Sequence, residues 1–139
     1  MKPPVEIETT ILAVLEEAGE ENVSALLNTV QENGGSTDEV YAFAAALSSL
    51  FNVGYVEFAS SRDNSSRRWL PISKEEIRVL LSQLELLLRW STNDRLWIWA
   101  DPLRPRVQVL LTSSGLAAAR EVLSNKGYPE ATSRKSLKR

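Results

Sequence analysis

The first 54 residues divide into three apolar segments, each followed by glycine. In residues 7–15, 23–30 and 40–51 the apolar side chains recur every three or four positions, which places them along one face of a helix. Glycine readily adopts the left-handed backbone that closes a helix, and it follows the three segments at residues 19, 34–35 and 54. The pattern predicts three consecutive helices.

A hairpin is predicted directly after the third helix. Residues 55–59 are rich in aromatic and β-branched side chains, which favour a strand. The polar stretch 60–66 is expected to be the tip, and residues 67–72 the returning strand. Pro71 lacks a backbone N–H, and this indicates that the returning strand lies at an edge.

A fourth helix and a second hairpin are predicted next. Ser73 and Glu76 have the spacing of a capping box, and the apolar stripe that follows predicts a helix as far as Trp90. The second hairpin is predicted to pair residues 96–100 with 106–111. The fourth helix has a wide apolar stripe, which suggests either core packing or the seam of a dimer.

The 139 residues have the length of one domain. We expect a single α+β domain over residues 1–128, with a last helix capped by Thr112 or Ser113 and ending near Gly127. Residues 129–139 are polar and basic and are expected to form a disordered tail. The sequence has no cysteine, no apolar leader and no apolar run approaching the roughly 18–20 residues of a membrane span. A cytoplasmic protein with no membrane partner is therefore expected.

The residue types present argue against catalysis. The chain contains no histidine and no cysteine, so it lacks the commonest general base, the commonest metal ligands and the thiol nucleophile. Adjacent acids such as Glu16-Glu17 and Glu75-Glu76 do not face each other on a helix. Gly34-Gly35 has no following Lys-Ser or Lys-Thr, so it is no phosphate-binding loop. We therefore expect a protein that is not an enzyme and that holds no cofactor and no metal.

Charge is distributed unevenly along the chain. Residues 1–61 contain one basic side chain, Lys2, against ten acidic ones, whereas residues 62–139 contain fifteen basic side chains against eight acidic ones. Such asymmetry is typical of an electrostatic binding surface, and it also arises when two halves of one fold complement each other.

Residues 11–58 resemble a winged helix-turn-helix domain of the kind found in bacterial regulators of the MarR and PadR type. The resemblance rests on three helical segments, on Gly54-Tyr55-Val56 after the third of them, and on a Leu-Thr-x-x-Gly junction at residues 111–115. It implies a winged-helix-like fold in which the first hairpin is the wing and the third helix enters a DNA groove. This sequence departs from the pattern because the junction follows the second hairpin, which adds a helix and a hairpin.

DNA binding is the alternative function that the resemblance implies. The predicted third helix presents Asp38, Glu39 and Tyr41 off its apolar face, and no lysine or arginine lies between Lys2 and Arg62. Phosphate contacts normally need cations, so these acids disfavour DNA, although Tyr41 is able to donate to a phosphate. The wing arginines would carry most of the DNA contacts; they are Arg62, Arg67 and Arg68.

Binding of a protein partner, or self-association as a homodimer, is the favoured function. Trp97 and Trp99 alternate onto one face of the second hairpin and are either exposed or covered by a helix. Arginines near these tryptophans give a composition that is enriched at interfaces; they are Arg95, Arg104 and Arg106. With Asp38 and Glu39 they are the candidate partner-binding residues. An accessory regulator, or an immunity or antitoxin-like protein whose acidic face masks a basic nuclease, would be a concrete form of this function.

Overall fold

The computed structural model of the chain describes residues 4–32, 34–61 and 69–125. Within these ranges the chain forms helices and antiparallel strands, so the predicted α+β class is confirmed. The helices are α1 (Pro4–Ala18), α2 (Val23–Val30), α3 (Thr37–Asn52), α4 (Lys74–Ser82), α5 (Leu84–Leu87) and α6 (Ser113–Asn125). The strands are β1 (Glu20–Asn22), β2 (Val56–Ser61), β3 (Trp69–Pro71), β4 (Leu88–Ser91), β5 (Leu96–Trp99) and β6 (Val107–Leu111).

Side-chain caps fix where four of the helices begin. Asn22 accepts a hydrogen bond from the amide of Ala25 at the start of α2, and the Ser36 hydroxyl accepts one from the amide of Asp38 at the start of α3. Ser73 and Glu76 form the complete predicted capping box of α4. At α6 the Thr112 hydroxyl accepts from the amide of Gly115, 3.0 Å away. The starts of α4 and α6 agree with the predictions because each cap is a local interaction.

The larger sheet has the strand order β1-β6-β2-β3, and every neighbouring pair is antiparallel. Strands β2 and β3 form the predicted first hairpin, in which Ala59 lies opposite Pro71. Pro71 is in an edge strand, as its missing N–H requires. Strand β1 was not predicted, because its three residues, Glu20-Glu21-Asn22, are all polar.

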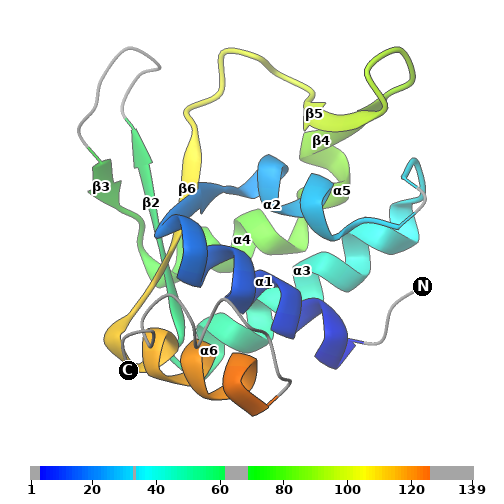
Figure 1. Ribbon diagram of the computed structural model, residues 1–139. Helices are drawn as coiled ribbons and strands as arrows, with labels where there is room; N and C mark the ends of the chain where they lie inside the picture. Colours follow the sequence, from blue (N-terminus) through cyan, green and yellow to red (C-terminus); the bar gives the residue numbers. More distant parts are fainter. Residues whose placement is uncertain (1–3, 33, 62–68, 126–139) are drawn as a thin grey trace.

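The predicted second hairpin is wrong. Strand β5 pairs back onto β4, with Leu88 opposite Trp99, and β6 instead lies between β1 and β2. The reason is the tight turn between β4 and β5, in which the Arg95 amide donates to the Ser91 carbonyl at 2.7 Å. The residues between β5 and β6 include two prolines and carry the chain across to the larger sheet (Figure 1).

The predicted fourth helix is too long. Helix α4 ends at Ser82, α5 has only four residues, and the chain has become a strand by Leu88. Leu84 and Leu88 are both buried, and apolar residues four positions apart are what a continuing helix would show. Leu88 nevertheless belongs to β4. Trp90 therefore lies on a strand rather than at the end of a helix.

One hydrophobic cluster extends from Ile7 in α1 to Ala119 in α6. Helix α1 contacts both α3 and α6, and α4 and α5 pack against α3. Figure 1 shows the β2–β3–β6 part of the larger sheet and the β4–β5 ribbon on opposite sides of the upper half of the molecule. No helix in the described part of the chain is long and apolar enough to cross a membrane.

Candidate functional site

The solvent-facing side of α3, which we call the α3 face, is polar and small. Val40, Phe43 and Leu47 point into the core from the opposite side of the helix. Tyr41 is 55% exposed and is the one large side chain of the α3 face. The residues of this face, all exposed, are Asp38, Tyr41, Ala45, Ser49 and Asn52. The face therefore contains a carboxylate and no cation.

Glu39 does not share the exposure of Asp38. It is half-buried, and its two carboxylate oxygens accept hydrogen bonds from the amides of Glu32 and Gly34, each at 2.9 Å. The side chain therefore fastens the connection between α2 and α3. Of the two acids predicted to meet a partner, Asp38 is the one that faces the solvent.

The β4–β5 ribbon is docked against α2 through Trp97. The Asn28 side chain donates to the Trp97 carbonyl at 3.0 Å and accepts from the Trp97 amide at 2.7 Å. It therefore makes the two hydrogen bonds that a neighbouring strand would make at this edge of β5. Trp97 is only 4% exposed and packs edge-to-face with Trp90, with 5.4 Å between the ring centroids. Trp97 is thus part of the core, and only an opening of the ribbon would let it touch a partner.

Trp90 in turn packs on the connection between α2 and α3. Its ring covers Gly34 and Gly35, and a Cβ atom added to Gly34 would overlap it. Gly34 also has φ +77°, which a side chain would strain. The ribbon and the connection that Glu39 holds are therefore in direct contact.

The predicted tryptophan and arginine residues do not form one surface. Trp99 is half-buried, and the Arg104 guanidinium carbon lies 5.5 Å from the centroid of its ring. Arg95 is exposed in the turn at the other end of β5, and Arg106 is exposed just before β6. The structure therefore brings Trp99 and Arg104 together and leaves Arg95 apart from them.

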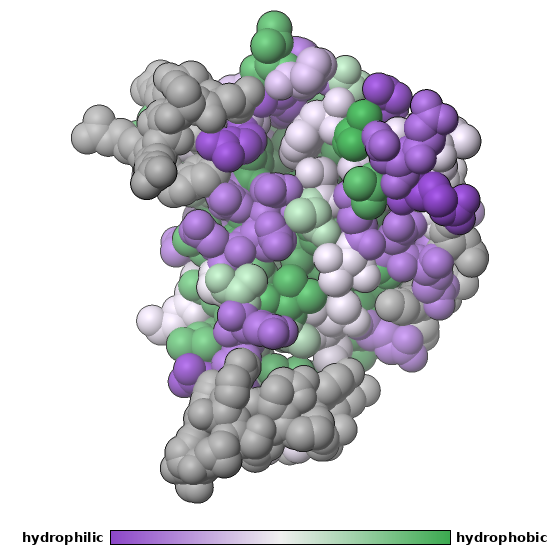
Figure 2. Space-filling model, turned by 45° about the horizontal axis from the view of Figure 1, so that its top comes forward, coloured by the Kyte–Doolittle hydropathy of each residue, from purple (hydrophilic) through white to green (hydrophobic). Residues whose placement is uncertain are grey.

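The apolar stripe of the fourth predicted helix, considered as a dimer seam, is buried within the chain itself. Ile77, Leu80, Leu81 and Leu84 are all in the core, whereas Leu86 is exposed. Figure 2 shows hydrophobic residues in separate patches among hydrophilic ones on the face that it presents. The stripe thus fits the first of its two interpretations, core packing.

The predicted wing arginines, Arg62, Arg67 and Arg68, lie outside the described residues, as do residues 129–139. Among the residues that the structure does describe, no group of three or more acidic side chains is placed to hold a metal ion.

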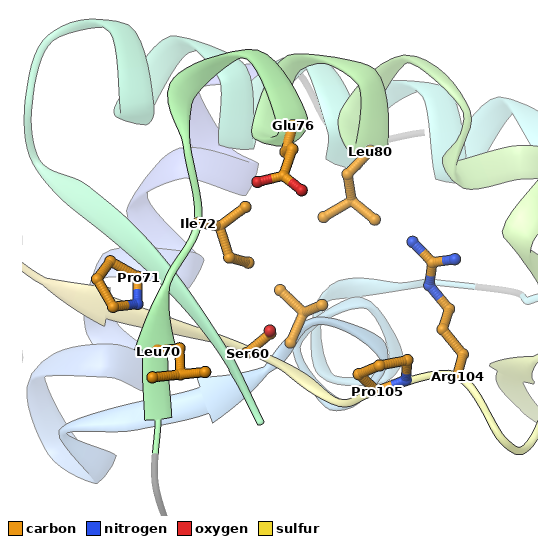
Figure 3. Close-up of a pocket in the computed structure, with 9 residues that line it drawn as sticks. Ser60, Leu70, Pro71, Ile72, Glu76, Leu80, Arg104 and Pro105 are labelled. Carbon is orange, nitrogen blue, oxygen red and sulfur yellow. The ribbon is translucent and has the colours of Figure 1, made fainter. Parts of the chain in front are cut away.

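A pocket of about 490 Å³ opens between α4, the β2–β3 hairpin and the segment that leads into β6 (Figure 3). Among the described residues that line it, the charged ones are Glu76 and Arg104. The lining residues are Ser60, Leu70, Pro71, Ile72, Glu76, Leu80, Arg104, Pro105 and Val107. Sequence reasoning missed this pocket because its walls come from segments far apart in the chain, and Glu76 was recognised only as a helix cap.

The two motifs that carry the winged-helix resemblance lie in contact with each other. The Thr112 amide donates to the Tyr55 carbonyl at 3.0 Å, and the Thr112 hydroxyl donates to the Gly54 carbonyl at 2.6 Å. Gly115 lies so close to Tyr55 that an added Cβ atom would overlap the Tyr55 carbonyl oxygen. Residues 54–55 and 111–115 thus form one junction. Gly115 permits the close approach to Tyr55, and Thr112 donates the two hydrogen bonds that join the segments.

These contacts define three places where function is to be sought: the α3 face, the pocket beside Arg104, and the junction that joins β2 to α6. Comparison with known proteins gives no match: no family model, no curated protein and no solved structure matches the chain.

Proposed function

We propose that the protein is a non-enzymatic, cytoplasmic binding module of the winged-helix type, and that it engages a basic protein surface through the α3 face. The order of elements supports the scaffold part of this proposal. Three helices precede β2, the antiparallel partner β6 leads into α6, and β3 to β5 are inserted between β2 and β6. The contact between residues 54–55 and 111–115 is a second support, since it joins the two motifs that suggested the family.

The charge of the α3 face is the observation that carries the choice of partner. The one acidic residue of the α3 face is Asp38, and the face has no basic residue. The sequence has no lysine or arginine between Lys2 and Arg62. A helix that lies in a DNA groove gains most of its affinity from cations that displace counterions from phosphates. Asp38 would instead repel the DNA backbone and attract a basic protein.

Tyr41 gives the α3 face a contact residue of the type that dominates protein interfaces. Its side chain is more than half exposed, whereas its neighbours Ala45 and Ser49 are small enough to let another chain approach closely. Tyrosines in such positions are enriched among the residues that contribute most to binding free energy. A protein that masks the basic surface of a nuclease is a concrete example of the proposed role.

The proposal is tested by titrating the full chain with an arginine- and lysine-rich helical peptide at about 0.15 M salt, and separately with random duplex DNA at low salt. We expect the peptide to bind, and D38K combined with Y41A to weaken its binding at least about tenfold. E17K makes the same charge change at an exposed site of α1 and serves as the matched control. Its effect should stay within about twofold, because long-range attraction at an exposed site is screened by salt.

Three results would overturn the proposal. Equal losses in D38K and E17K would show a non-specific response to net charge. A DNA shift with steep salt dependence that disappears in the triple variant R62A, R67A, R68A would place the protein among DNA-binding regulators. A dimer seen by light scattering and broken by D38K would make a second copy of this chain the occupant of the α3 face.

A further inference from the structure

The pocket beside α4 has the size and lining of a small-molecule site. Its volume of about 490 Å³ falls within the range of roughly 300–1,000 Å³ found for ligand pockets. Leu70, Ile72, Leu80 and Val107 give it apolar walls. Figure 3 shows Leu70, Ile72 and Leu80 around the space, with Glu76 entering from α4 and Arg104 from the segment before β6.

Arg104 is held beside the pocket by its contact with the Trp99 ring. The guanidinium lies over the Trp99 ring, which orients it, and its Nε atom is buried with no hydrogen-bond partner among the residues that the structure describes. Among the described residues, none forms an ion pair with this guanidinium. The buried Nε is closed to a ligand, so an anionic group would pair with the two terminal nitrogens, which a planar guanidinium offers to a carboxylate as paired donors. Arg104 is therefore placed to receive an anionic group.

Glu76 supplies the opposite charge on another side of the same pocket. One of its oxygens accepts hydrogen bonds from the Ser73 amide at 3.3 Å and the Ser73 hydroxyl at 3.1 Å, and this holds the carboxylate in place. Within the described part of the chain, no ion pair joins Glu76 to Arg104. Both charges thus face the space between them. A ligand with only a negative charge would be repelled by Glu76, and one with only a positive charge by Arg104.

We infer that this pocket binds a small amphoteric molecule with an apolar body, such as an apolar amino acid. The carboxylate of the ligand pairs with Arg104, its ammonium group faces Glu76, and its apolar part packs on Leu80 and Val107. No α3 residue lines the pocket, so this inference is independent of the proposed function.

Three probes with the same phenyl body separate the charge requirements: phenylalanine, 3-phenylpropionate and phenethylamine. Calorimetric titration of the full chain at pH 7 should show phenylalanine binding at least about tenfold more tightly than either singly charged probe. R104Q should weaken phenylalanine binding at least about tenfold. R78Q, at an exposed α4 position outside the pocket, should leave that binding unchanged.

E76Q tests the second charge without removing the helix cap, because glutamine also serves at this position of a capping box. In E76Q the preference for phenylalanine over 3-phenylpropionate should disappear, while the melting temperature stays close to that of the parent chain. The inference is overturned if none of the probes binds at millimolar concentration. It is also overturned if R104Q and E76Q bind phenylalanine as the parent chain does, or if R78Q weakens binding as much as R104Q.

Discussion

The larger sheet and the β4–β5 ribbon are attached to the helices by different kinds of contact. In the larger sheet, β6 pairs on both sides with other strands, and the turn that follows it is fastened to Gly54 and Tyr55 by backbone and hydroxyl hydrogen bonds. The ribbon has only two strands, and isolated two-stranded sheets are marginally stable in water. Its attachment depends on side chains, namely Trp90, Trp97 and Asn28.

The inserted ribbon persists because both its inner face and one edge are covered. The indoles of Trp90 and Trp97 form that inner face and are covered by α2 and the connection after it, and the Asn28 amide replaces the neighbouring strand at the edge. We therefore expect substitutions to act through loss of packing in the ribbon and through steric overlap at the junction of the larger sheet.

The largest effect is expected from removing the buried indole of the ribbon. Trp97→Ala should lower the free energy of unfolding by about 3–5 kcal/mol, because it leaves a large cavity against α2. Urea denaturation measures this loss. Leu96→Ala is the matched control, since the Leu96 side chain is 42% exposed on the opposite face, and its cost should stay below about 1 kcal/mol. Similar losses in the two variants would mean that the ribbon is not packed as described.

A single methyl group at the junction of the larger sheet should have the next largest effect. Gly115→Ala places a Cβ atom against the Tyr55 carbonyl oxygen, and backbone cannot move aside as a side chain does. We expect a loss of about 2–3 kcal/mol, although alanine normally stabilises a helix by about 1 kcal/mol relative to glycine. Thermal unfolding of G115A and of S114A, at the exposed neighbouring position, tests this expectation; a stabilised G115A would contradict it.

The smallest of the three effects is expected at the edge of the ribbon. Asn28→Ala leaves the Trp97 amide and carbonyl without their partner and should cost about 2 kcal/mol. Hydrogen exchange of the Trp97 amide should accelerate in N28A, while the amides of β6 stay protected. Asn28→Asp retains the acceptor and should protect that amide better than alanine does. Equal acceleration in both sheets would show that the ribbon does not open separately.

The helix starts were predictable from the sequence because each depends on residues within one turn. The box of Ser73 and Glu76 and the cap at Thr112 are local patterns that tertiary contacts did not override. The strands were less predictable. Strand β1 is polar along its whole length, and it exists because β6, far along the chain, supplies its partner.

The wrong hairpin had a signal that sequence reasoning gave too little weight. Residues 91–95 contain Asn and Asp, which favour a tight turn, whereas the connection between β5 and β6 contains two prolines and is longer. The choice between the two pairings depended on whether residues 88–90 continue the helix. Their apolar spacing fits both structures, so periodicity alone did not decide between them.

The candidate site was predicted only in part. Alternation along β5 correctly separated Leu96 from Trp97, but it could not show that the tryptophan side faces inward. That orientation is fixed by Asn28, which lies 69 residues away in the chain. The pocket at Arg104 is likewise formed by non-local packing, so no local pattern indicates it.

The Trp90–Trp97 pair has a practical consequence. Two indoles whose centres are 5.4 Å apart and whose planes are inclined by 66° share their electronic excitations. We expect their coupling to give a circular dichroism couplet in the intense far-ultraviolet band of indole, which is lost when the rings separate. The protein therefore contains an intrinsic optical reporter of whether its inserted ribbon is in place, and this reporter needs no label.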